Sequence, residues 1–176
     1  DPIDGIVYSE TKALQDNTLI GDWYSYFYDP ISAKAEVAFL DLPNYGTADV
    51  RVMVDAGAST ASIGAAVLGR QRIIGITNYG TGVGITDYSR KSRDDFGNFV
   101  IVPRGFAKRA DYDLTVESAQ IGMTQRVLAN LLTTPAVYIG DADREETIVY
   151  GFFKEFNIVI STPSISSCTI NVEGLT

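Results

Sequence analysis

The stretch that decides the fold class is "YGFFKEFNIVISTPSISSCTINVEGLT", from Tyr150 to Thr176. Residues 150–160 and 168–173 alternate between apolar and polar side chains, which is the period of a strand with one buried face. The serine-containing segment around Pro163 separates them, so the pattern predicts an antiparallel hairpin. Even-numbered positions are predicted to face the core, with Cys168 as a buried, inert thiol. Phe153 is then predicted to face outward and to contact a neighbouring layer or subunit.

Strand patterns dominate the rest of the chain. Residues 34–42 and 48–57 alternate in the same way, and short apolar runs follow at 63–69 and 70–76. Two longer extended runs flank the turn signal at 94–98, which predicts a long hairpin in which Pro103 marks a bulge or an edge position. Residues 135–141 read as one more strand.

One helix is predicted near 118–133, with Ser118 as its N-cap and Pro135 as its stop signal. About ten short strands without a βαβ rhythm favour a mainly β fold, an antiparallel, jelly-roll-like β-sandwich. A length of 176 residues suits one domain or two small ones, and we expect a single domain over residues 1–176. The start at "DPIDG" suggests the C-terminal part of a longer chain.

Composition excludes several function classes. A net charge of −8 disfavours binding to nucleic acid and to anionic membranes. No apolar run approaches the roughly 20 residues of a membrane helix, so no membrane insertion is expected. The chain has no histidine, so it cannot by itself build a Ser-His-Asp triad or the usual zinc site. We therefore expect no enzyme activity, no cofactor and no metal.

The aromatic run "DWYSYFYDP" is the candidate carbohydrate site, because aromatic rings stack on sugar rings and carboxylates accept hydroxyl hydrogen bonds. In an extended segment the three tyrosines would share one face. A packed core strand and a subunit interface are the alternatives. The residues of the candidate site are Asp22, Trp23, Tyr24, Tyr26, Tyr28 and Asp29.

Basic residues gather in the predicted long hairpin and form the candidate interface. Cross-strand ion pairs with neighbouring aspartates are the ordinary interpretation, and contact with a partner protein is the alternative. The basic residues are Arg90, Lys91, Arg93, Arg104, Lys108 and Arg109. The acidic loop Asp141–Glu146 could hold Ca²⁺, although it lacks the EF-hand frame and a solvated charged turn is favoured.

Several of these stretches together resemble a group of tail-associated proteins from tailed bacteriophages and prophages. The most specific parts are the "DYSRK…DDFG…RGFAKR" block and the "YGFFK…C…EGLT" ending. Members are often described as carbohydrate-binding, or as tail fibre or tail tip components, and many look as though they carry an upstream carbohydrate-binding module. The resemblance covers nearly the whole chain, and its motifs locate no site.

The resemblance implies a structural component of a phage tail tip or baseplate that contributes to virion assembly and host attachment. Such a chain would be made in the host bacterial cytoplasm and would lie in the virion tail. Its expected partners are other tail proteins and further copies of itself. The alternatives are a carbohydrate-binding module for host surface glycans and a polysaccharide-degrading enzyme, for which no carboxylate pair stands out.

Overall fold

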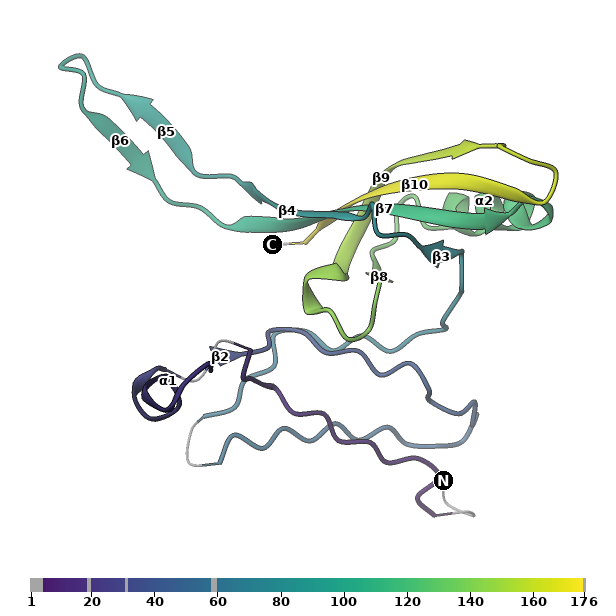
Figure 1. The fold of residues 1–176 in the computed structure, drawn as a ribbon, viewed down its shortest axis with the longest axis horizontal. Coiled ribbons are helices and arrows are strands. Elements are labelled where there is room, and N and C mark those ends of the chain that lie inside the picture. The colour runs from purple at the N-terminus through teal and green to yellow at the C-terminus, as the bar shows by residue number, and fades with distance from the viewer. Residues whose placement is uncertain (1–4, 19, 31, 58–59, 176) are drawn as a thin grey trace. The chain divides into compact units, whose positions relative to one another are not determined.

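The computed structural model describes residues 5–18, 20–30, 32–57 and 60–175 of the chain (Figure 1). The chain forms two compact units, Asp1–Gln71 and Arg72–Thr176. Strands account for 35% of the described residues and helices for 13%, with antiparallel sheets and one main helix, so the mainly β, sandwich-like prediction is confirmed. The sequence predicted one domain over residues 1–176, and no proline- or serine-rich linker marks the boundary near residue 71.

The second unit is built on a curled antiparallel sheet. In spatial order its strands are β3 (Ile76–Thr77), β7 (Phe106–Glu117), β10 (Ile165–Gly174), β9 (Ile148–Val159) and β8 (Ala136–Ile139). A further strand, β4 (Gly82–Asp87), also pairs with β7. The predicted closing hairpin is β9 and β10, and the strand expected within 135–141 is β8, so both predictions are confirmed.

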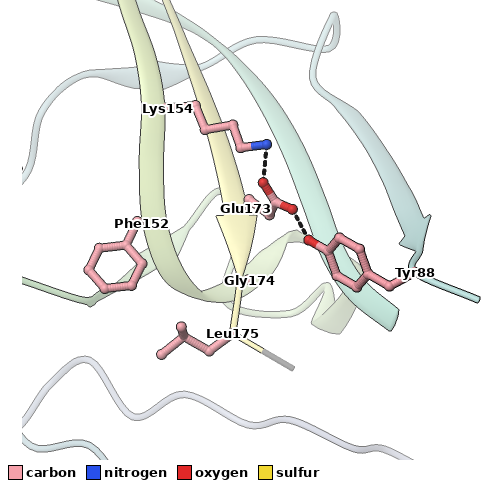
Figure 2. Close-up of a pocket in the computed structure, with 6 residues that line it drawn as sticks. All are labelled: Tyr88, Phe152, Lys154, Glu173, Gly174 and Leu175. Atoms are coloured by element: carbon pink, nitrogen blue, oxygen red, sulfur yellow. Dashed lines mark hydrogen bonds and ion pairs between the residues drawn. The ribbon is translucent and has the colours of Figure 1, made fainter. Parts of the chain in front are cut away.

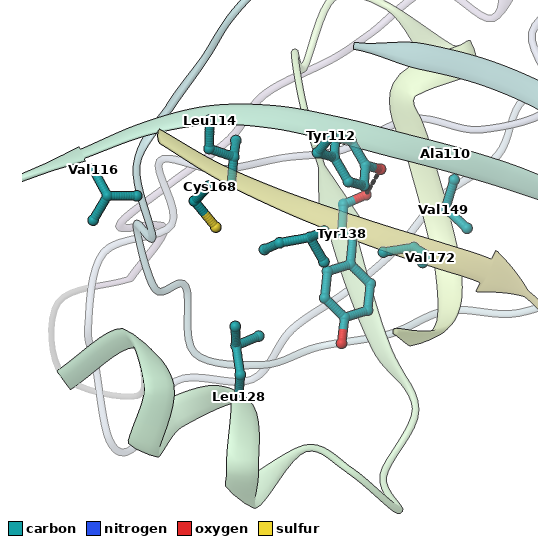
Figure 3. Close-up of a cluster of buried hydrophobic side chains, with 10 residues drawn as sticks. Ala110, Tyr112, Leu114, Val116, Leu128, Tyr138, Val149, Cys168 and Val172 are labelled. Carbon is teal, nitrogen blue, oxygen red and sulfur yellow. Dashed lines mark hydrogen bonds between the residues drawn. The ribbon is translucent and has the colours of Figure 1, made fainter. Parts of the chain in front are cut away.

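One face of this sheet carries the hydrophobic core, into which Leu128 projects from α2 (Ile121–Asn130) (Figure 3). Side chains opposite each other on β7 and β10, such as Leu114 and Cys168, lie in the same cluster. Each fully buried aliphatic side chain stabilises the fold by about 1.5–3 kcal/mol. The buried cluster comprises Ala110, Tyr112, Leu114, Val116, Leu128, Tyr138, Val149, Cys168, Ile170 and Val172.

The predicted helix is present, but it begins and ends differently. A 3₁₀ turn, Ser118–Gln120, precedes α2, whose N-cap is Gln120 and whose C-cap is Leu131. The Ser118 hydroxyl is 3.0 Å from the Thr162 carbonyl and 2.7 Å from the Ser166 hydroxyl. Ser118 was therefore wrongly predicted as the N-cap, because its side chain is taken up by the β9–β10 hairpin instead of by the first turn of the helix.

A β-bulge in β9 changes which side chains face the core. Phe153 lies opposite Val172 and Glu155 lies opposite Asn171, so Lys154 is the extra residue between them. An extra residue reverses the alternation of inward and outward side chains. The even-inward prediction holds for β10 and for Phe156 onward, whereas before the bulge the odd-numbered residues face the core.

The long hairpin predicted around 94–98 is also present, as a ribbon arm. We use this name for β5 (Arg90–Arg93), β6 (Phe99–Val102) and the tip 94–98. The tip closes through hydrogen bonds from the Asp94 amide to the Asn98 carbonyl (3.0 Å) and from the Gly97 amide to the Asp94 carbonyl (3.0 Å). Gly97 has φ +85°, which favours glycine. The arm projects beyond β4 and β7 (Figure 1), and Pro103 lies in the break between β6 and β7.

The first unit has little regular structure. A two-residue ladder joins β1 (Gln15–Asp16) to β2 (Ser32–Ala33), and α1 (Trp23–Tyr28) lies between them in sequence. The strands predicted at 34–42, 48–57 and 63–69 are wrong, and of 70–76 only Ile76 belongs to a strand, β3. Alternation specifies an extended backbone, but a strand also needs a ladder of successive hydrogen bonds with a neighbour, and a single contact such as that from the Lys34 amide to the Leu14 carbonyl (2.7 Å) does not form one. Ala38 is the one buried side chain among the described residues of this unit.

Candidate interaction surfaces

The aromatic run forms the short helix α1, not the extended segment predicted from the sequence. Asp22 is its N-cap, with Oδ1 accepting hydrogen bonds from the Ser25 amide (2.7 Å) and hydroxyl (2.9 Å). These bonds hold the pKa of the Asp22 carboxyl below its usual range, the amide of Ser25 contributing most. A local cap therefore competes successfully with the extended conformation that the alternating tyrosines suggested.

Helical spacing rearranges the aromatic rings. Trp23 stacks on Phe27 with ring centroids 6.1 Å apart, and Tyr24 lies 4.9 Å from Tyr28, because residues four apart share one side of a helix. Tyr24, Tyr26 and Tyr28 consequently do not form one common face, contrary to the prediction. Tyr26 instead makes edge contacts with Trp23 and Phe27.

All the aromatic side chains of α1 are exposed, so the alternative of a packed core strand is wrong. Trp23 is 78% exposed, and the helix contains no buried residue. Asp29, the C-cap residue, is exposed and lies directly after Tyr28. The candidate carbohydrate residues are thus together on one small, accessible helix, with a carboxylate at each end.

The basic residues of the second unit do not form one continuous strip. Lys91 and Arg93 point to one face of β5 and Arg90 to the other, because successive strand residues alternate. Lys108 and Arg109 lie on β7, beside β4.

Two of these basic residues form ion pairs with aspartates, but along the same chain segment and not across strands as predicted. Lys91 lies 2.8 Å from Asp87, and Arg109 lies 2.6 Å from Asp111. The Lys91 hydrogen bond is the main reason why the pKa of Asp87 is well below its usual range. Both pairs are solvent-exposed, so neither is expected to add much to the stability of the fold.

The most exposed apolar strand is β6, whose four residues are all apolar. Phe99 is 67% exposed and Ile101 60%, while Val100 and Val102 are each 45% exposed. Because the side chains alternate, both faces of β6 present apolar surface. Its neighbour β5 carries Arg90, Lys91 and Arg93, and Arg93 lies over the Phe99 ring at 4.6 Å. The charges of this arm were predicted to form an interface, whereas the exposed apolar strand β6 was not predicted, although the run "FVIV" is its signal in the sequence.

An open pocket of about 430 Å³ lies where the end of β10 meets Tyr88 (Figure 2). Glu173 accepts hydrogen bonds from Tyr88 and Lys154, which lower the pKa of its carboxyl, Lys154 contributing most. The hydrogen bond between Tyr88 and Glu173 also raises the pKa of the Tyr88 hydroxyl. Phe152 and Leu175 supply apolar lining. The charged groups of this pocket therefore satisfy one another, and the geometry assigns it no reactive group.

The bulge also decides where the two adjacent phenylalanines lie. Phe153, the predicted interface residue, packs against the core cluster, whereas Phe152 lines the open pocket. The predicted orientation of this pair was wrong because it assumed an uninterrupted alternation. The sequence did contain a signal for the bulge: two apolar residues, Phe152 and Phe153, are followed directly by the charged pair Lys154 and Glu155.

In the acidic loop Asp141–Glu146, the carboxylates are arranged around the side chain of Arg144. Arg144 lies 3.7 Å from Asp141 and 3.9 Å from Glu146, and the Asp143 amide donates to Asp141 at 3.0 Å. Within residues 5–18, 20–30, 32–57 and 60–175, no group of three or more His, Cys, Asp or Glu side chains is placed to hold a metal ion. This arrangement corresponds to the charged turn that the sequence favoured.

Comparison with known proteins does not identify a family for this chain. No protein-family model matches the chain, and a search of curated proteins found no significant match. Among the described residues, none of the helices has the length and apolar character needed to span a bilayer.

Proposed function

We propose that this chain is a structural subunit of a larger protein assembly, in which its ribbon arm docks onto a neighbouring subunit. The observation that carries the proposal is the exposure of all four apolar residues of β6. Soluble monomers rarely leave a contiguous apolar surface open, and unprotected edge strands promote association. A surface of this kind is expected to be covered in the assembled state.

The neighbouring parts of the arm support the same role. Phe96, at the tip, is 91% exposed, and Ile85 on β4 is 71% exposed. Phe96 lies beyond one end of β6, at the tip of the arm, and Ile85 lies on the strand that leads into the base of the arm. Burial of such aromatic and aliphatic anchors supplies most of the free energy of a protein interface.

The first unit points to an assembled state as well. Its described residues include one buried side chain, Ala38, while Ile6 is 88% exposed and Met53 83%. A segment of this length needs substantial apolar burial to offset the loss of conformational entropy. Its side chains are therefore expected to gain cover from a surface outside the unit.

The resemblance to tail-associated phage proteins suggests which assembly this is. We infer a place in a phage tail tip or baseplate, where the chain contributes to virion assembly and host attachment. Tail assemblies contain repeated subunits, and a projecting arm is a suitable means of linking neighbours. The inferred location is the virion tail, after synthesis in the host cytoplasm.

Purified virus particles from a bacterium that carries the gene provide the test. Mass spectrometry should detect the chain in intact particles, and cryo-electron microscopy should place its sheet in the tail with the arm against a neighbour. A variant in which the arm is shortened to a tight turn joining β4 directly to β7 should be lost from particles while keeping its β-rich circular dichroism. Intact particles that lack the native chain would contradict the proposal.

A second function, glycan binding, is favoured by one observation: Trp23 is 78% exposed on α1. The stacked pairs Trp23–Phe27 and Tyr24–Tyr28 offer flat apolar faces, and Asp29 offers a carboxylate beside them. Aromatic faces with adjacent hydrogen-bonding groups suit sugar rings. This role is compatible with a place in the tail, since a subunit can hold its neighbours and contact the host surface.

A glycan array followed by calorimetric titration tests this second function. Trp23→Ala should weaken binding at least tenfold, because it removes the largest ring while retaining a good helix former. Tyr79→Ala is the matched control, since Tyr79 is fully exposed and lies outside α1. Binding that survives Trp23→Ala would exclude α1 as the platform.

A further inference from the structure

We propose that β6 is a dimerisation strand, which pairs with β6 of a second copy of this chain. The two strands would run antiparallel across a two-fold axis and form a four-stranded sheet in the order β5–β6–β6–β5. This inference rests on the proposed assembly role and names the partner and the contact.

The first step is that one edge of β6 is open. On one side β6 pairs with β5, from Arg90–Val102 to Arg93–Phe99. No other described strand pairs with β6. An unpaired edge presents backbone N–H and C=O groups that can accept another strand.

The position of β10 explains why this edge is open. Along the ribbon, β6 is followed by β7 in the same direction, and β4 is followed by β5 in the same way. On β7 the side away from β4 is taken by β10, whose pairing reaches only Glu173 opposite Arg109. A strand that pairs with the open edge of β6 would therefore lie on the same side of the ribbon as β10, beyond the point where the pairing of β10 with β7 ends at Glu173.

The second step is the contrast between the two strands of the arm. The outer strand β5 is polar throughout, which protects its own free edge against association. The strand β6 has no charged residue to protect its free edge in the same way. In the proposed dimer the unprotected edge of β6 becomes paired, and the charged strand β5 stays at the edge of the sheet.

The third step is self-complementarity, which favours a second copy as the partner. No residue of β6 is charged, so antiparallel pairing with itself brings no like charges together. The register that pairs all four residues sets Phe99 opposite Val102 and Val100 opposite Ile101 of the second copy. This is an isologous contact, in which both copies use the same surface.

The fourth step is a match of charge between the tip and the base of the arm. In that register Gly97 in the tip of one copy lies opposite Arg104 of the other, which brings the tip residue Asp95 near Arg104, and the two-fold axis repeats the arrangement. Both residues are exposed, and neither forms an ion pair with another described residue. Phe96 of one copy likewise comes opposite Gly105 of the other, next to Phe106, which is 57% exposed.

Sedimentation analysis of the full chain over a concentration series tests the inference. The native chain should show a monomer–dimer equilibrium, and Ile101→Lys should raise the dissociation constant of the dimer at least tenfold by placing a charge in the new ladder. Thr169→Lys is the matched control: it adds the same charge at an exposed position of β10 and should leave the equilibrium unchanged.

A charge exchange tests the register without touching β6. Asp95→Arg and Arg104→Asp should each weaken the dimer several-fold, because each brings like charges together twice. The double variant should recover the native dissociation constant. Circular dichroism of all variants should match the native chain.

Several results would overturn the inference. One is a native chain that stays monomeric across the series, and another is a dimer that is indifferent to both Ile101→Lys and the charge exchange. If the chain were still found in virus particles, the assembly role would stand and only the identity of its partner would be wrong. Absence from particles, with an intact dimer, would instead contradict the assembly role.

Discussion

Phe153 is the cross-strand partner of Val172, and this pairing brings it against the core even though the adjacent Phe152 lines an open pocket. The bulge at Lys154 permits this arrangement, because it reverses the alternation at that point of β9. The two neighbouring phenylalanines therefore have different roles in the fold.

Alanine substitution should distinguish these roles. Phe153→Ala should lower the free energy of unfolding by about 2–3 kcal/mol, somewhat less than a fully buried phenylalanine, because it removes core contacts. Phe152→Ala should cost about 1 kcal/mol or less, since solvent already reaches that side chain. Urea unfolding of the two variants measures the difference, and equal losses would show that both rings contribute alike to the core.

Gly151 is expected to tolerate no side chain. A Cβ atom there would clash with the Glu173 carbonyl oxygen and lie 2.7 Å from the Gly174 Cα, both on the neighbouring strand β10. Gly151→Ala should therefore destabilise the chain by about 3 kcal/mol, through forced separation of β9 and β10. Gly84→Ala is the control, because nothing lies within 4 Å of its Cβ position on β4. That variant should change stability by less than about 1 kcal/mol, and thermal unfolding of both compares them.

The Cys168 thiol should be unreactive in the folded chain. Burial raises its pKa to about 11, and the negative charge of Asp113 adds to the shift. At pH 8 the group is then protonated and inaccessible, whereas the thiolate is the reactive form. A colorimetric thiol reagent should react with it only after denaturant is added. Thr169→Cys, on the exposed face beside it, should react at once, and fast reaction of Cys168 itself would contradict its burial.

Glu173 should make stability depend on pH in the acid range. Hydrogen bonds from Lys154 and Tyr88 lower its pKa in the folded state below the ordinary value of 4.5. Its contribution is therefore fully present above about pH 5 and is lost as the pH falls through the lowered pKa. The stability difference between the native chain and Glu173→Gln should be constant near neutrality and should shrink toward pH 3.

Urea unfolding between pH 7 and 3 measures that difference. Glu155→Gln controls for the loss of a carboxylate on the same sheet, because Glu155 forms no ion pair with another described residue. A Glu173→Gln difference that stays flat down to pH 3 would contradict the hydrogen-bonded carboxylate.

Local features of the sequence were enough to predict much of the second unit. The closing hairpin, the long hairpin with its turn at 94–98 and the strand near 136–139 were all predicted correctly. Each depends on alternation and turn residues within a short segment, which are properties of neighbouring residues. The main helix was found for the same reason, although its first turn was misassigned at Ser118.

The errors arose where structure depends on distant contacts or on competing local signals. The extended segments of the first unit alternate like strands, but none of residues 34–57 belongs to a strand. The aromatic run alternates too, yet capping by Asp22 and ring stacking four residues apart make it helical. For the candidate sites, the sequence pointed to the aromatic residues of α1 and to the charged residues of the arm. It did not predict how the side chains of either set are arranged in space.

The sequence by itself therefore determined the β class, the hairpins and the residues available for contact. The tertiary structure decided which of them face the core and which stay open: the bulge at Lys154 turned Phe153 inward, and the end of β10 pairing at Glu173 left one edge of β6 open. The physical reason is that alternation is set by each residue's neighbours in sequence, whereas register and strand pairing are set by backbone hydrogen bonds between segments far apart in it.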